Sequence, residues 1–388
     1  MVSSATGPGG NGADPAVRKL FFYGTLRHIP LLELVLGRKL PEAQLVATRL
    51  PEHRVYAVQD QIFPMIVQSP GGMAEGLLFS GATAADVERL EFYEGGFDFD
   101  LRPVTLENGE EALVFFPEAS HWQPGAPWDL EAWIAAYGAV NLMAAEEFMS
   151  YLGRFSFEEL TRRYPMMCNR AWSRMLAREK PPVSLGSGKG RADVEILSHT
   201  RPYSSFFALD EIRLRFNRFN GIKSGEIMRE VFVGTDAIIV LPYDPVRDRV
   251  LVVEQIRMGP FVRGADVLWM LEPVAGLIDL GESPETAVRR ETLEETGLNL
   301  GDLHLVSRAY PSPGATTEYY HTYIAIADLP DDAGGVAGLA SEEEDIRSHV
   351  LSFDRLMEVV DSGEAQTGPL VMCALWLARN RERLRGDA

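Results

Sequence analysis

Residues 276–298, GLIDLGESPETAVRRETLEETGL, decide the fold of the region around them. Ser283 is a favoured residue for the N-cap of a helix, and Pro284 suits the first helical position. Gly297 suits the left-handed conformation that commonly follows a helix. The stretch therefore predicts one short helix, Pro284–Thr296, with a loop before it and a sharp stop after it.

Three carboxylates fall on one face of this predicted helix. Glu291 and Glu295 are four residues apart, and Glu294 is three residues from Glu291, so their side chains are neighbours. Crowded carboxylates repel one another unless a cation lies between them. Hard oxygen ligands that leave room for water and phosphate suit Mg²⁺, and we include Mn²⁺ as the substitute ion. The pattern predicts a divalent-metal site that acts on a phosphate-containing substrate.

The fixed positions of the stretch resemble the Nudix box, G-x5-E-x7-R-E-U-x-E-E-x-G-U, in which U is apolar. The matching residues are Gly276, Glu282, Arg290, Glu291, Glu294, Glu295, Gly297 and Leu298. Thr292 departs from the pattern, because an apolar residue is usual there. The alternative is a solvated acidic helix with a chance spacing. The matched glycine loop, cap and arginine favour the box.

The resemblance implies a role for the residues around the box. The implied metal ligands are the side chains of Glu291 and Glu295 and the backbone carbonyl of Ala275. We expect Glu282 to fix the box loop, with Arg290 as its partner, rather than to bind the metal directly. Arg290 is expected to pair with carboxylates of the box and not with substrate.

Residues 194–385 resemble the ADP-ribose pyrophosphatase branch of the Nudix family. The resemblance rests on the VEQIR run that ends at Arg257 and on the loop Ser312-Pro313-Gly314 that leads to Glu318. It implies that Arg257 and Glu272 contact the substrate, since a guanidinium fork suits phosphate or ribose. A structural ion pair at Arg257 is the alternative.

The same resemblance implies a hydrolytic reaction. Glu318 is the candidate base and Glu294 is a catalytic carboxylate beside the metal, although Glu318 could instead be an ordinary exposed loop acid. The expected substrate is ADP-ribose or a related nucleoside diphosphate sugar, and the products from ADP-ribose are AMP and ribose 5-phosphate. A second possibility is a nucleotide sensor that does not catalyse, and the intact set of carboxylates weighs against it.

The N-terminal region, from Lys19 to Phe116, resembles the γ-glutamylcyclotransferase family, including its AIG2-like branch. The resemblance rests on the strand end Tyr23-Gly24-Thr25-Leu26, on FPMIV with a following PGG, and on Glu94-Gly95 with a downstream arginine. It implies that the Tyr23–Leu26 loop binds substrate and that Glu94 is the general acid and base. Asp100 stands where an aromatic residue is usual. Cyclotransferase activity and a role in binding alone both stay open.

Length and motif positions predict the domain organisation. With 388 residues, two domains are the natural expectation. The expected parts are a disordered tail (1–17), a γ-glutamylcyclotransferase-like domain (18–127), a helical connector and linker (128–191) and a Nudix domain (192–388). The predicted fold class is α+β, with a small β-barrel-like fold first and a Nudix α/β/α sandwich last. The pairing resembles that of tellurite-resistance proteins, although the sequence itself indicates no tellurium chemistry.

Composition excludes several classes of partner. The formal net charge of −19 argues against a general nucleic-acid or anionic-membrane binder. We find no apolar stretch long enough to span a membrane. The two cysteines, Cys168 and Cys373, lack the spacing of a metal site and suggest a reducing cytoplasm.

The β-rich run 194–233 predicts a homodimer formed through the Nudix domain. A Nudix core does not need these strands, and in the ADP-ribose branch such an extension packs on the partner subunit. The apolar residues that a lone extension would expose are Phe206, Phe207, Leu209, Ile212, Leu214, Phe216 and Phe219. Packing of the same residues on the helical connector of one chain is the alternative.

Overall fold

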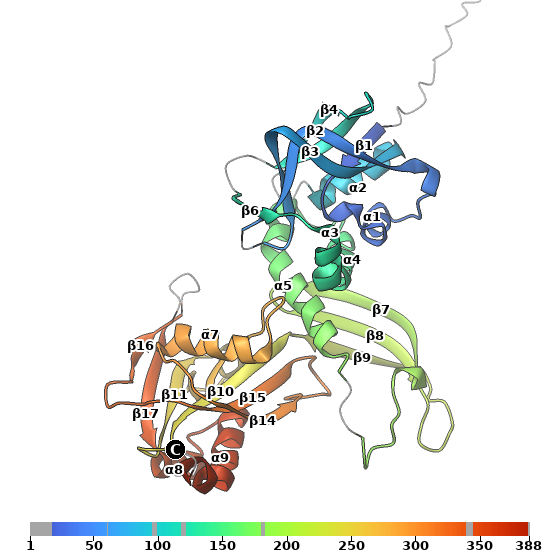
Figure 1. Cartoon of the computed structure of the whole chain (residues 1–388). Helices are drawn as coiled ribbons and strands as arrows, with labels where there is room; N and C mark the ends of the chain where they lie inside the picture. Colours follow the sequence, from blue (N-terminus) through green and yellow to red (C-terminus); the bar gives the residue numbers. More distant parts are fainter. Residues whose placement is uncertain are drawn as a thin grey trace, which may run out of the picture. The chain divides into compact units, whose positions relative to one another are not determined.

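The computed structural model describes residues 18–59, 61–94, 99–117, 122–179, 183–338 and 344–386. The expected tail 1–17 and residues 181–182 of the expected linker lie outside these ranges. The chain forms two compact units, Met1–Ala171 and Trp172–Ala388 (Figure 1). The mixture of helices and strands in both units confirms the predicted α+β class.

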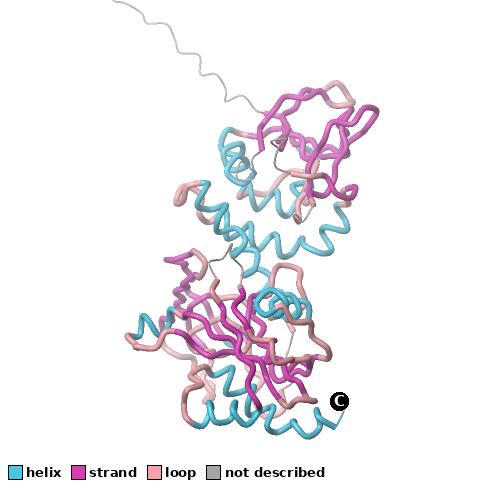
Figure 2. Tube along the Cα trace, turned by 90° about the vertical axis from the view of Figure 1, so that its left-hand side faces the viewer, coloured by secondary structure: helices cyan, strands magenta, loops and turns pink. Residues whose placement is uncertain are grey.

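Unit 1 is built on one curled six-stranded sheet with the strand order β4-β5-β1-β3-β2-β6. Its strands are β1 (Arg18–Phe22), β2 (Leu45–Val58), β3 (Pro64–Ala82), β4 (Phe99–Thr105), β5 (Glu111–Pro117) and β6 (Pro124–Pro127). The tube in Figure 2 shows that the sheet formed by these strands is strongly curved. Phe21 and Phe22 belong to different apolar clusters, because neighbouring residues of a strand point to opposite faces.

The β-like runs 42–50, 53–58, 66–67 and 74–79 predict four short strands in unit 1, with a break at the Pro-Gly residues 69–72. The structure has two long strands in their place. The Pro-Gly segment at residues 69–72 does not end β3, so the predicted break there is wrong. Pro51 pairs with Met73 and His53 pairs with Gln68, so residues 69–72 form a bulge opposite Glu52. Glu52 has a positive φ of 57°, and its carboxylate accepts a hydrogen bond from the Gly71 amide at 2.9 Å. The bulge absorbs the turn-forming residues while pairing continues on both sides.

The helices of unit 1 pack on this sheet, and the last of them ends at residues that belong to unit 2. They are α1 (Ile29–Leu36), α2 (Ala84–Glu94), α3 (Leu130–Trp133), a π-helical turn (Ile134–Gly138), α4 (Ala139–Met149) and α5 (Phe157–Leu176), with short 3₁₀ turns at Thr25–Arg27 and Glu42–Gln44. The sequence predicts a helical run from residue 128 to about 180. The run is interrupted by the turn at residues 150–156, which contains Gly153 at a φ of 74°.

Unit 2 contains an eight-stranded mixed sheet with the strand order β14-β15-β10-β11-β17-β16, in which β12 pairs with β11 and β13 with β10. Its strands are β10 (Asp236–Asp244), β11 (Arg249–Ile256), β12 (Trp269–Glu272), β13 (Val274–Leu277), β14 (Leu303–Ala309), β15 (Tyr319–Ile326), β16 (Gly335–Ala337) and β17 (Ile346–Ser352). The sequence predicts a hairpin turn at residues 244–248, between two β-like runs, and this turn joins β10 to β11. Alternation along these strands supplies apolar side chains to both faces of the sheet.

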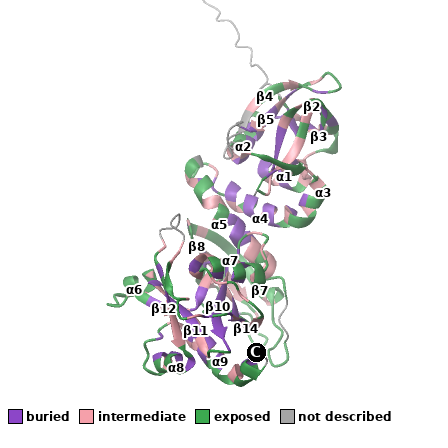
Figure 3. Ribbon diagram, turned by 60° about the vertical axis from the view of Figure 1, so that its left-hand side comes forward, coloured by how far each residue is buried: buried purple, intermediate pink, exposed green. Residues whose placement is uncertain are grey.

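Helices cover both faces of this sheet, which gives the predicted α/β/α sandwich. Helix α7 (Pro284–Thr296) contributes Ala287 and Val288 to the core on one face. Helices α8 (Phe353–Asp361) and α9 (Gly368–Gly386) close the other face. In Figure 3 the buried residues follow β10 and β11 between these layers. A short helix that the sequence did not predict, α6 (Met258–Arg263), joins β11 to β12.

A separate three-stranded antiparallel sheet precedes the sandwich. It consists of β7 (Val194–Ser204), β8 (Ala208–Phe216) and β9 (Ile227–Val233), in that order. Apart from Ser204, β7 is exposed or only partly buried along its whole length. Within the described ranges, no helix is long and apolar enough to cross a membrane.

Candidate active site

Helix α7 carries most of the candidate site, and its observed limits are those that the sequence predicts. The Ser283 hydroxyl accepts a hydrogen bond from the Thr286 amide at 3.1 Å and caps the first turn. Gly297 ends the helix in the left-handed conformation, with a φ of 71°. Thr292, the departure from the box pattern, is fully buried and donates its hydroxyl to the Val288 carbonyl at 2.7 Å. A helix hydrogen-bonded in this way tolerates threonine at an apolar position.

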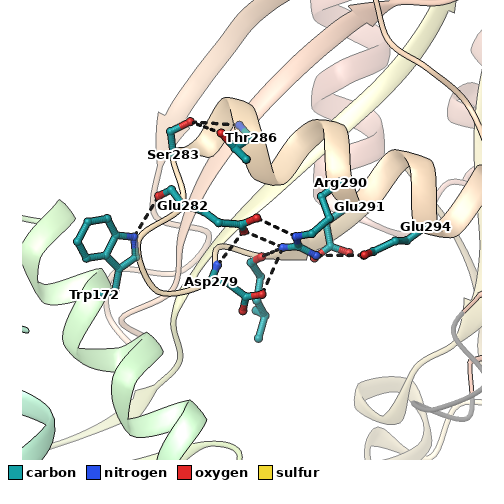
Figure 4. A network of polar contacts seen from close by, with 9 residues as sticks. Trp172, Asp279, Glu282, Ser283, Thr286, Arg290, Glu291 and Glu294 are labelled. Atoms are coloured by element: carbon teal, nitrogen blue, oxygen red, sulfur yellow. Dashed lines mark hydrogen bonds and ion pairs between the residues drawn. The ribbon is translucent and has the colours of Figure 1, made fainter. Parts of the chain in front are cut away.

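Arg290, in the middle of α7, is the centre of a polar network that joins the helix to the loop before it (Figure 4). Its Nε and Nη2 atoms donate to the two carboxylate oxygens of Glu282, each at 2.9 Å, and Nη2 also donates to the Leu277 carbonyl at 3.0 Å. Nη1 donates to Glu291 Oε1 at 2.7 Å and to Glu294 Oε2 at 3.1 Å. The guanidinium therefore fixes the loop and two box carboxylates together, as the sequence predicts for Glu282 and Arg290.

Glu295 is a buried acid, and Glu291, one helical turn before it on α7, is half-buried. Burial, above all, raises the pKa of Glu291 to about 7, although Arg290 works in the opposite direction. Burial, followed by repulsion from Glu291, raises the pKa of Glu295 to about 8. Glu295 is 3% exposed, and its Oε2 atom has no hydrogen-bond partner among the described residues. A buried carboxylate oxygen without a described partner fits the role of a cation ligand.

The chain fits the implied cation at this place. The carboxylate of Glu291 packs directly on the α-carbon of Gly276, which adjoins Ala275 on β13. Two carboxylates and one carbonyl are hard oxygen donors that leave further positions for water and phosphate. Within the described ranges, no group of three or more His, Cys, Asp and Glu side chains is arranged to hold a metal by itself. The implied set contains two such side chains and a carbonyl.

Glu318 lies directly before β15, on a loop with its own internal hydrogen bonds. The Thr316 hydroxyl accepts from the Glu318 amide at 3.1 Å and is 3.3 Å from Glu318 Oε2. The Glu318 side chain packs on Gly234, where a β-carbon would overlap it, and the Thr317 hydroxyl donates to the Gly234 carbonyl at 2.9 Å. Burial raises the pKa of the Glu318 carboxyl, which suits an acid that exchanges protons.

Arg257 and Glu272 form an ion pair across the β11–β12 connection. Arg257 Nε donates to Glu272 Oε2 at 2.7 Å, and the Arg257 side chain is 40% exposed. Burial raises the pKa of Glu272, and Arg257 offsets part of that effect. Both residues contribute to the electrostatic environment of Glu295. The predicted substrate residues and the predicted metal ligands therefore share one neighbourhood, and the ion pair leaves part of the guanidinium open to solvent.

Two residues near this site escaped the sequence analysis. Burial and the charges of Glu318 and Glu272 raise the pKa of Tyr320 to about 12, so its hydroxyl lies near both acids. Tyr320 follows Glu318 by two residues, and alternate residues of a strand share a face. This spacing could have predicted that Tyr320 lies on the same side as Glu318. The indole Nε1 of Trp172 donates to the backbone carbonyl of Glu282 at 3.2 Å. No sequence signal joins residues 110 positions apart.

Unit 1 contains a pocket that brings its predicted residues together. The pocket is lined by Phe21, Phe22, Tyr23, Gly24, Thr25, Leu26, Ile62, Phe63, Pro64, Tyr93, Glu94, Phe115, Asn141 and Tyr164. Burial raises the pKa of Glu94 to about 7. The lining residues Asn141 and Tyr164 come from α4 and α5 and were not predicted. Asp100 pairs with Phe116 in the β4–β5 ladder, and its side chain lies outside the described part of the chain.

Comparisons with known proteins match both halves of the chain. Residues 234–370 match the NUDIX domain family, and residues 20–135 match the family described as gamma-glutamyl cyclotransferase, AIG2-like. These ranges contain the box and the Tyr23–Leu26 loop, respectively. The expected resemblance to tellurite-resistance proteins finds no support in these matches.

Three curated relatives illustrate the similarity of unit 2. An ADP-ribose pyrophosphatase of Escherichia coli (strain K12) is 38% identical over 213 residues, which are 55% of this chain and 99% of that protein. An ADP-ribose pyrophosphatase of Haemophilus influenzae is 34% identical over 50% of this chain and 89% of that protein. A GDP-mannose pyrophosphatase of Salmonella arizonae is 33% identical over 45% of this chain and 88% of that protein. The chain belongs to the Nudix hydrolase family, with a C-terminal Nudix domain related to ADP-ribose pyrophosphatases and an N-terminal domain of the AIG2-like γ-glutamyl cyclotransferase type.

Proposed function

We propose that unit 2 hydrolyses the pyrophosphate bond of ADP-ribose or a related nucleoside diphosphate sugar in a Mg²⁺-dependent reaction. The observation that carries the proposal is the pair of half-buried Glu291 and buried Glu295, in which Glu295 Oε2 has no partner among the described residues. The two carboxyls are shielded from water and repel each other, which raises both pKa values, and a bound cation would offset this cost. The similarity to ADP-ribose pyrophosphatases supports the choice of substrate class.

The proposed chemistry assigns a task to each group of the chain. Bound between Glu291, Glu295 and the Ala275 carbonyl, Mg²⁺ would neutralise the diphosphate and make its bound water more acidic. Glu318 accepts a proton from the water that attacks one phosphorus, and the bond from that phosphorus to the bridging oxygen breaks. AMP and ribose 5-phosphate are then the products from ADP-ribose. Glu294, held by Arg290 at 3.1 Å, is the further catalytic carboxylate.

Arg257 is proposed to bind the substrate while Glu272 orients it. Arg257 donates a hydrogen bond to Glu272 through Nε, and the Arg257 side chain is partly exposed. A guanidinium that is anchored at one edge can present its other edge to a phosphate or a ribose hydroxyl. The Glu272 carboxylate would thus act through Arg257 as well as directly.

A substrate panel tests this function. The full chain is incubated with ADP-ribose, GDP-mannose and other nucleoside diphosphate sugars, with Mg²⁺ or with a chelator, and the products are separated by chromatography. We expect ADP-ribose to be cleaved only with the metal, and Mn²⁺ to substitute for it. Binding of ADP-ribose without turnover would support the nucleotide-sensor alternative instead.

We also propose a homodimer formed through the β7–β9 sheet. By register, Ile196, Leu214 and Ile227 lie side by side across its three strands on one face. Ile196 is 55% exposed, and the adjoining loop carries Phe219 at 86% exposure. Leu214 and Ile227 are half-buried, so apolar side chains with exposed area occupy this face, as is common at an interface. A second copy of the chain is the proposed partner, since burying a large apolar side chain contributes roughly 1.5–3 kcal/mol.

A second candidate activity belongs to unit 1, and the pocket is the observation that favours it. The pocket unites the Tyr23–Leu26 loop with Glu94, whose raised pKa suits a general acid and base. We propose cyclisation of a γ-glutamyl amine, with release of 5-oxoproline and the free amine. Incubation with γ-glutamyl amines and detection of 5-oxoproline by mass spectrometry tests it, with Glu94→Gln as the control. We propose a cytoplasmic location for the protein. The free thiols of Cys168 in unit 1 and Cys373 in unit 2 are both buried, which fits this location.

A further inference from the structure

The last turn of α5 belongs to unit 2 and packs within that unit through three neighbouring residues. Trp172 and Leu176 pack against the apolar cluster beneath α7. The Ser173 hydroxyl accepts a hydrogen bond at 2.7 Å from the amide of Asp236, the first residue of β10. Trp172 and Ser173 precede residues 234–370, which match the NUDIX family. This turn is therefore an addition to the part of the fold that the family defines.

Trp172 also contacts the loop that leads into the box. Its indole Nε1 donates to the Glu282 carbonyl at 3.2 Å, and Figure 4 shows the ring beside that loop. The Glu282 amide donates to the Asp279 carbonyl at 3.0 Å, and the Asp279 amide donates back to Glu282 Oε2 at 3.1 Å. The loop is thus closed on itself at Asp279 and Glu282, and the indole holds it from outside.

Each further contact leads toward the candidate metal ligands. The Glu282 carboxylate takes two hydrogen bonds from Arg290, and Arg290 in turn holds Glu291 at 2.7 Å and Glu294 at 3.1 Å. A shift of the Glu282 backbone would move the carboxylate that orients Arg290. A line of hydrogen bonds therefore runs from Trp172 to the carboxylates of α7.

We propose that Trp172 is a positioning residue of the Nudix site, which holds the box loop so that Glu282 and Arg290 keep Glu291 in place for the cation. The proposal rests on the proposed function, because it assigns Glu291 to the metal. It separates two contributions of the indole. The ring packs on the core, whereas the N–H group fixes the loop. Replacement by phenylalanine removes the N–H group and part of the ring volume, so the control must lose the same volume elsewhere.

The test compares Trp172→Phe with Trp376→Phe in the full chain. Trp376 packs against the cluster on the opposite face of the sheet, far from the box loop in the fold, and serves as the matched control. Hydrogen exchange of the metal-free proteins is measured for peptides that cover residues 278–290. We expect these amides to exchange about three- to tenfold faster in Trp172→Phe, as for loss of one hydrogen bond. Trp376→Phe should match the wild type.

Kinetics provide the second readout. In Trp172→Phe the Mg²⁺ concentration for half-maximal ADP-ribose hydrolysis should rise by about three- to tenfold, with a smaller change in kcat. Loop exchange and Mg²⁺ requirement equal to those of the wild type would overturn the proposal. If the wild type itself does not cleave ADP-ribose, the proposed function fails, while the exchange comparison still decides whether the indole holds the loop.

Discussion

The carboxylate of Glu291 lies directly against the α-carbon of Gly276, so that a β-carbon there would overlap all three of its terminal atoms. Gly276 is not among the glycines with positive φ in the described chain, so its conformation does not require glycine. Glycine is required there because the Glu291 carboxylate approaches too closely to leave room for a β-carbon. Arg290 holds the same carboxylate from the other side at 2.7 Å. The first glycine of the box therefore provides the space in which Glu291 is held.

Gly276→Ala should displace Glu291 and lower hydrolysis by about 100-fold, because the carboxylate would leave the position from which it binds the metal. The backbone conformation permits alanine, so the fold should survive. Steady-state kinetics and circular dichroism measure the two effects. Gly368→Ala is the matched control, since a β-carbon there meets nothing within 4 Å. Equal losses in both variants would contradict a local effect at Glu291.

Glu295→Gln should abolish hydrolysis while the protein stays folded. The change keeps the shape of a buried side chain and removes its charge, so the cation loses a ligand. Thermal unfolding with and without Mg²⁺ provides a readout without substrate. The wild type should be stabilised by Mg²⁺, through binding to the folded state alone, and the variant much less. A variant with more than about a tenth of wild-type kcat would contradict the metal assignment.

Glu94→Gln should change how stability depends on pH. The folded pKa of Glu94 is raised from 4.5 to about 7 by burial, so the folded state holds this proton more tightly than the unfolded state. Stability of the wild type then falls as the pH rises from 4.5 to 7, and the loss persists above that range. The glutamine variant lacks this loss, so its advantage in melting temperature should grow across that window. An advantage that does not vary with pH would show that Glu94 ionises normally.

The same variant separates the two proposed sites. Glu94→Gln should leave ADP-ribose hydrolysis unchanged, because Glu94 and the box belong to different compact units. Formation of 5-oxoproline, where the wild type shows it, should disappear. Parallel loss of both activities would argue against two independent sites.

Size-exclusion chromatography with light scattering should give a dimer for the full chain. Ile196→Asp places a charge on the exposed apolar face of the β7–β9 sheet and should shift the equilibrium toward monomer. Val246→Asp is the control, since Val246 is 74% exposed on the β10–β11 turn, away from that sheet. A wild-type monomer at micromolar concentration that cleaves ADP-ribose would rule out a dimer-built pocket.

Local signals explain which parts of the structure could be predicted. The limits of α7 follow from Ser283, Pro284 and Gly297, which lie within one stretch and act on their own backbone. The break expected at residues 69–72 was wrong, because turn-forming residues can also form a bulge inside a long ladder. The contact from Trp172 to Glu282 joins distant segments, and only the fold brings them together.

Identification of the products with and without Mg²⁺ tests the central claim most directly. The purified full chain is incubated with ADP-ribose, and AMP and ribose 5-phosphate are measured by chromatography and mass spectrometry beside a Glu295→Gln control. The account predicts equal amounts of the two products from the wild type with Mg²⁺, and neither product after chelation or in the variant. Cleavage that persists with a chelator, or that proceeds equally in Glu295→Gln, would contradict it.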